Sequence, residues 1–290
     1  MIKGVRLTAG HLSMNIGVLP SPLTFLFWNI AGNHRADMLA RLAHARDIDV
    51  LILAECRTPP GKLLTALSSA GGAFTHSFSQ CEAIQVYTRF SGTFLTPVVE
   101  STRISIRRLR LPARIEILLA MMHLPSKRYR SETGQTLAAT QYAELIGDAE
   151  SIVGHTRTAV VGDLNMNPFE AGVSGAGGFH AVSSRQVAAR QSRTVDGKTF
   201  RFFYNPMWGH FGDRAEGPPG TYYHAGSGPD AIFWHILDQV LVRPELLPAF
   251  RNSDLQILTG DGTESFINRN GIPDKAVASD HLPLLFRLYL

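Results

Sequence analysis

The segment from Ala159 to Pro168 constrains the fold of this chain more than any other stretch. An Ala-Val-Val run leads into Gly-Asp-Leu-Asn, and Pro168 prevents a strand from continuing past that point. The pattern predicts a buried strand that ends in a tight polar turn. Asp163 and Asn165 are two residues apart, so in extended geometry their side chains would point the same way. Such a pair suits a hard cation, a phosphate or a held water, although Asp and Asn are also ordinary turn residues.

Other apolar runs also end in polar residues. Residues 24–30 and 49–55 are nearly continuous apolar runs, which is typical of strands buried on both faces. An apolar stripe over residues 38–45 predicts a helix between them, and Asn33 is placed to cap it. A second short helix is predicted over residues 62–70. This alternation of strand and helix favours an α/β layered fold.

From residue 73 to residue 123 the sequence consists of short apolar runs separated by turn residues, which predicts successive strands with short turns. Over residues 103–109, arginines partly alternate with apolar residues, so we expect a strand with a basic face. That face could bind a polyanion or could simply be solvated. A further strand over residues 114–122 leads to His123, and near-helical apolar spacing predicts a long helix over residues 132–153.

Residues 170–230 are rich in Gly, Pro, Ser and aromatic residues, and predicted loops of that length are usually functional. Trp208, Tyr222 and Tyr223 lie in this region. They could stack on nucleic-acid bases or could fill a small local core. Both interpretations remain open from the sequence.

The last part of the chain adds two more polar positions. Residues 236–242 predict a strand that carries Asp238 inside it, and a carboxylate within an apolar strand is costly unless it is paired. Asp280 and His281 come just before a closing strand expected over residues 284–290. Asp238 is therefore predicted to be the buried partner of a histidine.

Composition limits the class of protein. With 290 residues, 44% of them hydrophobic and 18% charged, the chain can bury a sizeable core. We expect an N-terminal appendage of unknown structure at residues 1–22 and a single catalytic domain at residues 23–290. The net charge of +4 permits a polyanionic partner without requiring one. Two cysteines, with no signal-peptide pattern and no apolar run long enough for a membrane span, predict a cytoplasmic protein.

The candidate site residues share a position at or near the end of an apolar run: Asn29, Glu55, His123, Asp163, Asn165, Asp238, Asp280 and His281. Ligand sites in layered α/β sheets gather at strand ends. Carboxylate and carboxamide oxygens suit Mg²⁺ or Mn²⁺, and histidines can donate to phosphate oxygens or move protons. No zinc-type spacing and no Gly-x-Ser-x-Gly elbow is present. These residue types point to metal-assisted phosphoryl chemistry.

The ordered motifs resemble those of the endonuclease/exonuclease/phosphatase superfamily, which has the deoxyribonuclease-I-like fold. The motifs that carry the resemblance, spread over residues 24–290, are Trp28-Asn29, Ala54-Glu55, His123-Leu124-Pro125, Gly162-Asp163-Leu164-Asn165, Leu237-Asp238-Gln239 and Ser279-Asp280-His281. The resemblance implies a four-layered α/β sandwich with two central, mostly antiparallel sheets covered by helices. It also implies hydrolysis of a phosphoester with Mg²⁺ or Mn²⁺.

The resemblance also implies roles for individual residues. Glu55 would bind the metal, and Asn29 would help to position the metal and the phosphate. Asp280 is a further predicted metal residue. Asp163 would activate or orient the water, with Asn165 assisting. His281 would contact the phosphate, and Asp238 would hold His281. His123 is the remaining predicted catalytic residue.

Two departures from the family pattern matter. Ala54 stands where the family often has glutamine, which affects fine positioning near Glu55. His123 stands where the abasic-site endonuclease branch usually has tyrosine. A histidine at this position instead resembles the deoxyribonuclease-I, sphingomyelinase and phosphatase branches. Apurinic repair is therefore the less expected activity.

The leading hypothesis is a nuclease, that is, a phosphodiesterase with DNA or RNA as substrate. The expected substrate contacts are Arg103, Arg107, Trp208 and Tyr222. One alternative is a phosphatase or phospholipase that acts on inositol phosphates or lipid phosphoesters. Another is a catalytically inactive phosphate-binding module, which would not need the full set of metal and phosphate residues.

Overall fold

The computed structural model describes residues 21–290 except residues 129, 214, 228 and 230. Nearly all of the appendage predicted at residues 1–22 lies outside the described residues. None of the described helices is both long enough and apolar enough to cross a bilayer.

Two sheets stand at the centre of the molecule. The strands of the first sheet are β1 (Leu23–Asn29), β2 (Val50–Ala54), β3 (Thr75–Ser77), β4 (Ile84–Thr88), β16 (Gln256–Ile257) and β17 (Leu284–Leu288). The strands of the second sheet are β5 (Leu95–Glu100), β6 (Ile104–Leu109), β7 (Ile117–His123), β8 (Thr158–Asp163), β9 (Ala181–Val182), β12 (Phe203–Tyr204) and β15 (Asp238–Val242). The strand orders are β16-β17-β1-β2-β4-β3 and β5-β6-β7-β8-β15-β12-β9.

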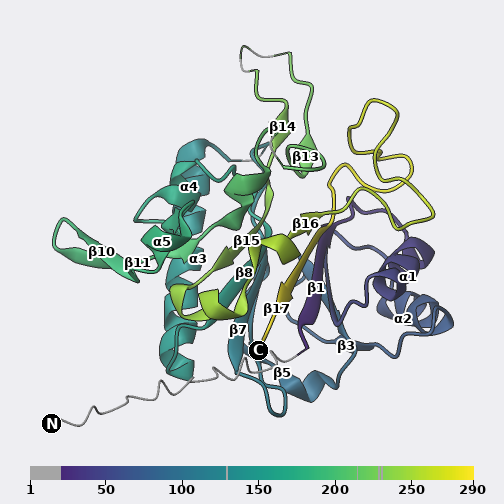
Figure 1. Cartoon of the computed structure of the whole chain (residues 1–290), viewed down its shortest axis with the longest axis horizontal. Helices are drawn as coiled ribbons and strands as arrows, with labels where there is room; N and C mark the ends of the chain where they lie inside the picture. The colour runs from purple at the N-terminus through teal and green to yellow at the C-terminus, as the bar shows by residue number, and fades with distance from the viewer. Residues whose placement is uncertain (1–20, 129, 214, 228, 230) are drawn as a thin grey trace, which may run out of the picture.

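Helices cover the outer faces of both sheets. They are α1 (Ala36–Ala45), α2 (Pro60–Ser69), α3 (Glu132–Val153), α4 (Ala171–Ser174) and α5 (Arg185–Ala188). Four short 3₁₀ helices are also described, at Gly92–Phe94, Pro206–His210, Pro244–Ala249 and Asn252–Asp254. Figure 1 shows α1 and α2 on one side of the paired sheets and α3 and α4 on the other. The predicted four-layered sandwich with mostly antiparallel sheets is therefore confirmed.

Three apolar layers hold these elements together. The central layer lies between the sheets, where the rings of Phe25 and Phe286 stack 4.9 Å apart. A second layer joins the first sheet to α1 and α2 and contains Trp28. A third joins the second sheet to α3. Every residue of β1, β2 and β7 is buried, as expected for continuous apolar runs with covered faces on both sides.

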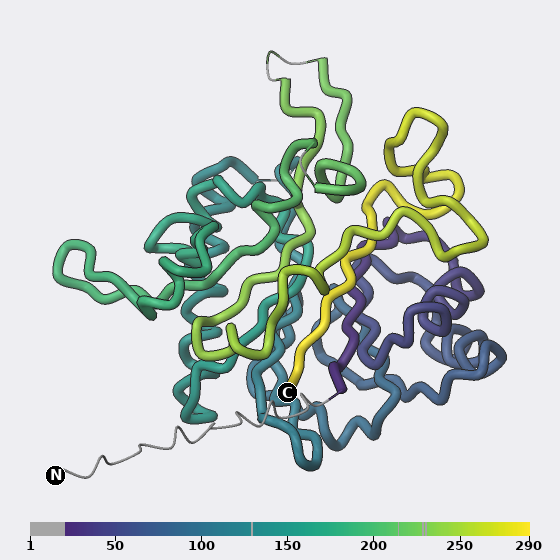
Figure 2. Tube along the Cα trace, viewed as in Figure 1, coloured from purple at the N-terminus to yellow at the C-terminus, as the bar shows by residue number. Residues whose placement is uncertain are grey.

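Each sheet contains one parallel strand pair that a helix connects, and the second sheet contains a further short parallel pair, β9 with β12. In the first sheet β1 and β2 are parallel and α1 connects them, and in the second sheet β7 and β8 are parallel and α3 connects them. Asn29 pairs with Ala54, and His123 pairs with Asp163, at the carboxyl ends of these strands. In Figure 2 the purple β1 and the yellow β17 run side by side, so both ends of the described chain meet in one sheet. The two parallel pairs that a helix connects direct their polar ends toward a common region.

Some local expectations need correction. Asp238 is the first residue of β15 and does not lie inside the strand, although it is fully buried. Asn33 does not cap α1; Arg35 occupies the N-cap, and Asn33 donates through Nδ2 to the carbonyl of Ala278 at 2.9 Å. The long helix α3 begins and ends as predicted, with Ser131 accepting a hydrogen bond from the amide of Gly134 at its start.

The expectation that Arg107 binds substrate is wrong, because its side chain lies between the two sheets and is only 2% exposed. Ile104 and Ile106 of the same strand pack toward α3, so Arg107, by alternation, faces the other sheet. Its guanidinium donates to Glu100 Oε1 at 2.6 Å and to Ser77 Oγ, in β3 of the first sheet, at 2.7 Å. Arg107 therefore joins the edges of the two sheets.

Replacing Arg107 by alanine is expected to lower the free energy of unfolding by about 3–5 kcal/mol, because it leaves the Glu100 charge buried without its partner. The matched control is Arg108→Ala in the same strand. Arg108 pairs with Glu116 at 3.3 Å on a partly exposed surface, where such pairs contribute about 1 kcal/mol or less. Urea unfolding of both variants measures the difference. Equal, small losses would show that the Arg107 network is not a structural link.

The same network predicts a pH dependence of stability. Burial alone would raise the pKa of Glu100, but hydrogen bonds from Ser79, Ser105, the amide of Gln80 and Arg107 lower it from 4.5 to about 2. The contribution of Glu100 to stability is therefore complete above about pH 4.5 and is lost as the pH falls through 2. Urea unfolding between pH 5 and pH 2 should show a shallower decline for Glu100→Gln than for the parent chain.

Candidate active site

The polar ends of the two parallel strand pairs meet in one cavity of about 480 Å³. Glu55 comes from the first sheet, and His123, Asp163 and Asn165 come from the second. His281, from the loop before β17, completes the cavity wall. Residues predicted from separate motifs far apart in the sequence are thus brought together.

The backbone turns sharply where the site begins. Ala31, Glu55 and Asn165 follow β1, β2 and β8, and they adopt left-handed φ angles of 50°, 50° and 51°. For residues other than glycine this conformation costs about 1–2 kcal/mol each, with asparagine the most tolerant. Strain of this kind concentrates at functional sites. Here it turns the Glu55 side chain into the cavity directly after the strand ends.

The turn after β8 differs from the expected extended geometry. The amide of Asn165 donates to Asp163 Oδ1 at 2.8 Å, and Asn165 Nδ2 donates to the carbonyl of Leu124 at 2.9 Å. The two side chains therefore share the cavity through a compact turn and not through strand alternation. This arrangement fixes one carboxylate oxygen of Asp163 and leaves Oδ2 for the centre of the site.

Asn29 organises the two carboxylates of the site. Its Nδ2 donates to Asp163 Oδ2 at 3.0 Å and to Glu55 Oε1 at 3.3 Å. Its Oδ1 accepts the backbone N–H of Ala31 at 3.0 Å, which fixes the orientation of the amide. In this arrangement Asn29 positions Glu55 and Asp163 through its amide nitrogen, and the expectation that Asn29 binds the metal stays a prediction.

His123 lies close to both carboxylates. Its Nε2 is 3.6 Å from Glu55 Oε1 and 3.6 Å from Asp163 Oδ2. The Glu55 side chain is 46% exposed, whereas that of Asp163 is 2% exposed. Two carboxylates that share one amide donor and open onto a cavity are a donor set that fits a hard divalent cation. Glu55 and Asp163 are the residues that would hold it.

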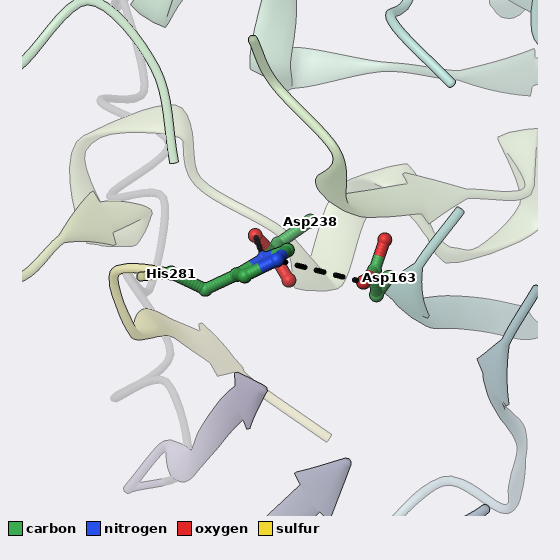
Figure 3. A group of neighbouring side chains, drawn as sticks. All are labelled: Asp163, Asp238 and His281. Atoms are coloured by element: carbon green, nitrogen blue, oxygen red, sulfur yellow. Dashed lines mark hydrogen bonds and ion pairs between the residues drawn. The ribbon is translucent and has the colours of Figure 1, made fainter. Parts of the chain in front are cut away.

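His281 lies between two carboxylates, as Figure 3 shows. Its Nδ1 is 2.8 Å from Asp238 Oδ2, and its Nε2 is 3.9 Å from Asp163 Oδ2. Burial alone would lower the pKa of His281, but Asp238, Asp163 and Asp280 raise it to about 10. His281 is therefore protonated at neutral pH, so Nε2 presents a charged donor toward the cavity.

The loop that carries His281 is tied to β1. Trp28 Nε1 donates to the carbonyl of His281 at 2.9 Å, and Ser279 Oγ donates to the carbonyl of Asn29 at 2.7 Å. Ser279 Oγ also accepts the amide of His281 at 3.2 Å. Trp28 and Ser279, both within the recognised motifs, thus hold the imidazole in place. Asp280 also lines the cavity and accepts from Lys275 Nζ at 2.7 Å, and its expected role as a metal residue stays a prediction.

The expected substrate contacts fall in different places. Tyr222 lines the cavity, with its ring 4.8 Å from that of His281. Arg103 does not line it; its Nη1 donates to the carbonyl of His123 at 3.3 Å and supports the end of β7. Trp208 also lies outside the cavity and packs against Phe169 at 6.4 Å. Of this set, only Tyr222 is at the site.

Several cavity residues were not singled out from the sequence. They are Ser126, Lys127, Arg128, His224, His235 and Lys275. The signal for three of them was present, because Ser126, Lys127 and Arg128 directly follow the His123-Leu124-Pro125 motif. His224 and His235 come from the hairpin of β13 (Tyr222–Tyr223) and β14 (Trp234–His235), where no local pattern marks them.

Comparison with known proteins supports a common fold. A family model described as Endonuclease/Exonuclease/phosphatase family matches residues 26–281. No match was found among curated protein sequences. The solved structure of truncated Caenorhabditis elegans TDP2 aligns with a TM-score of 0.52 at 15% identity, covering 94% of this chain and 100% of that chain.

Two further solved structures are similar. D. rerio TDP2 complexed with single-strand DNA product has a TM-score of 0.53 at 14% identity, covering 93% of this chain and 100% of that chain. ANGEL2, described as a 2',3'-cyclic phosphatase, has a TM-score of 0.56 at 14% identity, covering 92% of this chain and 95% of that chain. At these identities the likeness shows the fold alone.

Proposed function

Because the chain belongs to the endonuclease/exonuclease/phosphatase family, we propose that it is a divalent-metal-dependent phosphodiesterase that hydrolyses nucleic acid. The observation that carries the proposal is the convergence in one cavity of Glu55 and Asp163 with His123 and His281. Two carboxylates for a cation and two histidines for a phosphoryl group form a complete hydrolytic set. A pure binding module would not need both.

The side chains have distinct parts in the reaction. Asp163, held by Asn29 and Asn165, orients the attacking water. Protonated His281, fixed by Asp238, donates a hydrogen bond to the phosphoryl oxygens as negative charge develops on them, and His123 does so from the other side. A bound Mg²⁺ or Mn²⁺ would supply Lewis-acid stabilisation of the leaving oxygen.

Charge at the rim supports a polyanionic substrate. Lys127, Arg128 and Lys275 line the cavity. Lys127 and Arg128 are exposed, as required of groups that contact a phosphate backbone. The net charge of +4 agrees with such a partner, and D. rerio TDP2, which has a similar fold, is complexed with single-strand DNA product in its solved structure. These rim residues replace Arg107 as the expected contacts with the substrate, because Arg107 is buried. Lys127 and Lys275 also contact Glu170 and Asp280, and all three cations line the cavity.

A substrate panel tests the proposal. With Mg²⁺, the protein is expected to turn over bis-p-nitrophenyl phosphate slowly, and single-stranded DNA, duplex DNA or RNA faster. Asp163→Asn keeps the side-chain shape and should reduce all of these rates to background. Inositol phosphates and lipid phosphoesters complete the panel. Rapid turnover of either class, with no hydrolysis of nucleic acid, would replace the nuclease with a phosphatase or phospholipase.

The salt dependence of oligonucleotide binding tests contact with the phosphate backbone, independently of hydrolysis. Each backbone contact releases condensed counterion, so affinity for an oligonucleotide should fall steeply as salt rises. Replacing Lys127 and Arg128 together by alanine should reduce the slope of log affinity against log salt by about 2. The matched control replaces Arg108 and Arg110, which pair with Glu116 outside the cavity, and should leave the slope unchanged. The same slope in both double variants would contradict tracking of the backbone at the rim.

A further inference from the structure

His235 lines the cavity but has no part in the steps above. It ends β14 and pairs with Tyr222 of β13, and the two ring centroids are 6.3 Å apart. The Tyr222 ring in turn lies 4.8 Å from the ring of His281. The ring of Tyr222 thus lies between His235 and His281, the histidine proposed to bind the phosphate. A group bound there would adjoin the scissile phosphate and would not be that phosphate itself.

The hydrogen bonds of Asn167 determine which nitrogen of His235 carries the proton. Asn167 Oδ1 accepts the backbone N–H of Ile236 at 3.0 Å, and a backbone N–H can only donate. The amide nitrogen Nδ2 must therefore be the atom that faces His235 Nδ1, at 3.0 Å. Since Nδ2 also only donates, Nδ1 is an acceptor and the proton of the neutral ring is on Nε2.

Asn167 is itself held firmly. It is 2% exposed, and Glu170 Oε1 accepts both its backbone N–H at 2.7 Å and its Nδ2 at 3.2 Å. Lys127 Nζ donates to the same Glu170 oxygen at 2.5 Å. Asn167 follows the turn of Asp163 and Asn165 by two residues, so the support of His235 is built onto the catalytic loop. Asn167 therefore orients the His235 ring.

His235 stays neutral. Burial lowers its pKa, and the nearby Lys127 and His224 lower the pKa further, while Glu170 and a backbone hydrogen bond with Ile232 oppose them. Protonation would also direct an Nδ1–H at the amide hydrogens of Asn167. His235 is therefore an oriented, uncharged N–H donor, and the ion pair of Lys127 with Glu170 lies near it. An anionic oxygen is the partner that this arrangement favours.

We propose that Nε2 of His235 binds an oxygen of a second phosphate, one that neighbours the scissile phosphodiester. This inference rests on the proposed function and names a substrate feature for it: a second phosphate group next to the bond that is cut. The site would then discriminate polynucleotides and phosphorylated dinucleotides from isolated diesters. No bond is made or broken at His235, which acts only in binding and specificity.

The tautomer can be tested without activity. Long-range proton–nitrogen correlation NMR on ¹⁵N-histidine-labelled protein distinguishes Nε2–H from Nδ1–H rings, and loss of a signal in His235→Gln assigns it. We expect the Nε2–H pattern for His235 at pH 7. An Nδ1–H pattern, or a charged ring, would overturn the proposal independently of what the enzyme hydrolyses.

The second phosphate is tested by binding. Asp163→Asn, which should not hydrolyse the ligands, is titrated by calorimetry with the dithymidine diester and with its 5'- and 3'-phosphorylated forms. One phosphorylated form should bind more tightly than the unphosphorylated diester. Adding His235→Phe should reduce that preference about tenfold, because an aromatic ring remains but the donor is lost, while His235→Gln should retain most of it. Thermal unfolding confirms that both variants fold.

Kinetics separate this inference from the proposed function. In the protein with Asp163 intact, His235→Phe should raise KM for the preferred phosphorylated dinucleotide and leave bis-p-nitrophenyl phosphate unchanged. Equal losses on both substrates would assign His235 a merely structural role. No preference for either phosphorylated form in binding would refute the second-phosphate site. Failure to hydrolyse any diester would refute the proposed function while the binding result still decides the inference.

Discussion

Replacing Asp238 by asparagine is expected to slow phosphodiester hydrolysis by about 10³- to 10⁴-fold, the loss seen when the buried carboxylate behind a catalytic histidine becomes an amide. Asp238 Oδ2 is 2.8 Å from His281 Nδ1, and both side chains are buried. Asparagine keeps the size but removes the charge that keeps His281 protonated. The variant should remain folded, because the strand β15 and its neighbours are otherwise unchanged.

The pH profile distinguishes this role from a structural one. The carboxylates raise the pKa of His281 to about 10, so the protonated form is present from acidic pH up to that value. In Asp238→Asn, burial is no longer offset by Asp238, and His281 loses its proton at lower pH. Residual kcat should then decline with rising pH well below 10, where the parent enzyme shows no such decline. An unchanged profile would contradict the pairing.

Coupling between the two residues gives a second check. If Asp238 acts only through His281, then the double variant Asp238→Asn, His281→Ala should be little worse than His281→Ala alone. Losses that multiply would show that the two side chains act independently. The measurement is kcat/KM for bis-p-nitrophenyl phosphate, a small substrate that does not depend on the basic rim.

Replacing Glu55 by glutamine is expected to reduce Mg²⁺-dependent hydrolysis by orders of magnitude, because a hard cation loses one of the two carboxylates at the site. The change should raise the Mg²⁺ concentration needed for half-maximal rate as well as lowering the maximal rate. Glu55 is half-exposed, so the fold should tolerate the substitution. Near-parental activity with the same Mg²⁺ dependence would remove Glu55 from the metal site.

A control separates charge loss from disturbance of the turn. Glutamine preserves the left-handed turn at residue 55 and the hydrogen bond that Oε1 accepts from Asn29. Glu55→Asp keeps the charge but shortens the side chain, and should keep Mg²⁺ dependence with a lower rate. Isothermal titration with Mg²⁺ then compares the affinities of the two variants directly. Equal affinity in both would show that the carboxylate does not hold the ion.

The sequence predicted the strand ends well, because a continuous run of apolar residues indicates a buried strand and the first polar residue marks its end. The continuous apolar run before Asp163 predicted a strand covered on both faces, and β8 ends at Asp163 as expected. The same logic located Asn29, Glu55 and His123. Their meeting in one cavity did not follow from any single run, and came from the resemblance of the ordered motifs. The structure places Glu55, His123 and Asp163 at that cavity.

What the sequence could not predict depends on contacts between distant elements. Alternation along β6 showed that Arg107 differs in face from Ile106, but not which face lies between the sheets. The orientation of the Asn29 amide depends on the N–H of Ala31 in a left-handed turn. His235 enters the site through a hairpin whose partner strand is only two residues long. None of these has a local signature.

The two parallel strand pairs have a consequence for how the site holds together. In each sheet the parallel pair that a helix connects is flanked by antiparallel strands, β17 and β4 around one pair and β6 and β15 around the other. The catalytic centre therefore lies between two half-sites, one at the end of each of these pairs, much as a dimer builds a site at its interface. A shift of one sheet against the other would separate Glu55 from Asp163. The catalytic geometry therefore depends on how the two sheets pack against each other.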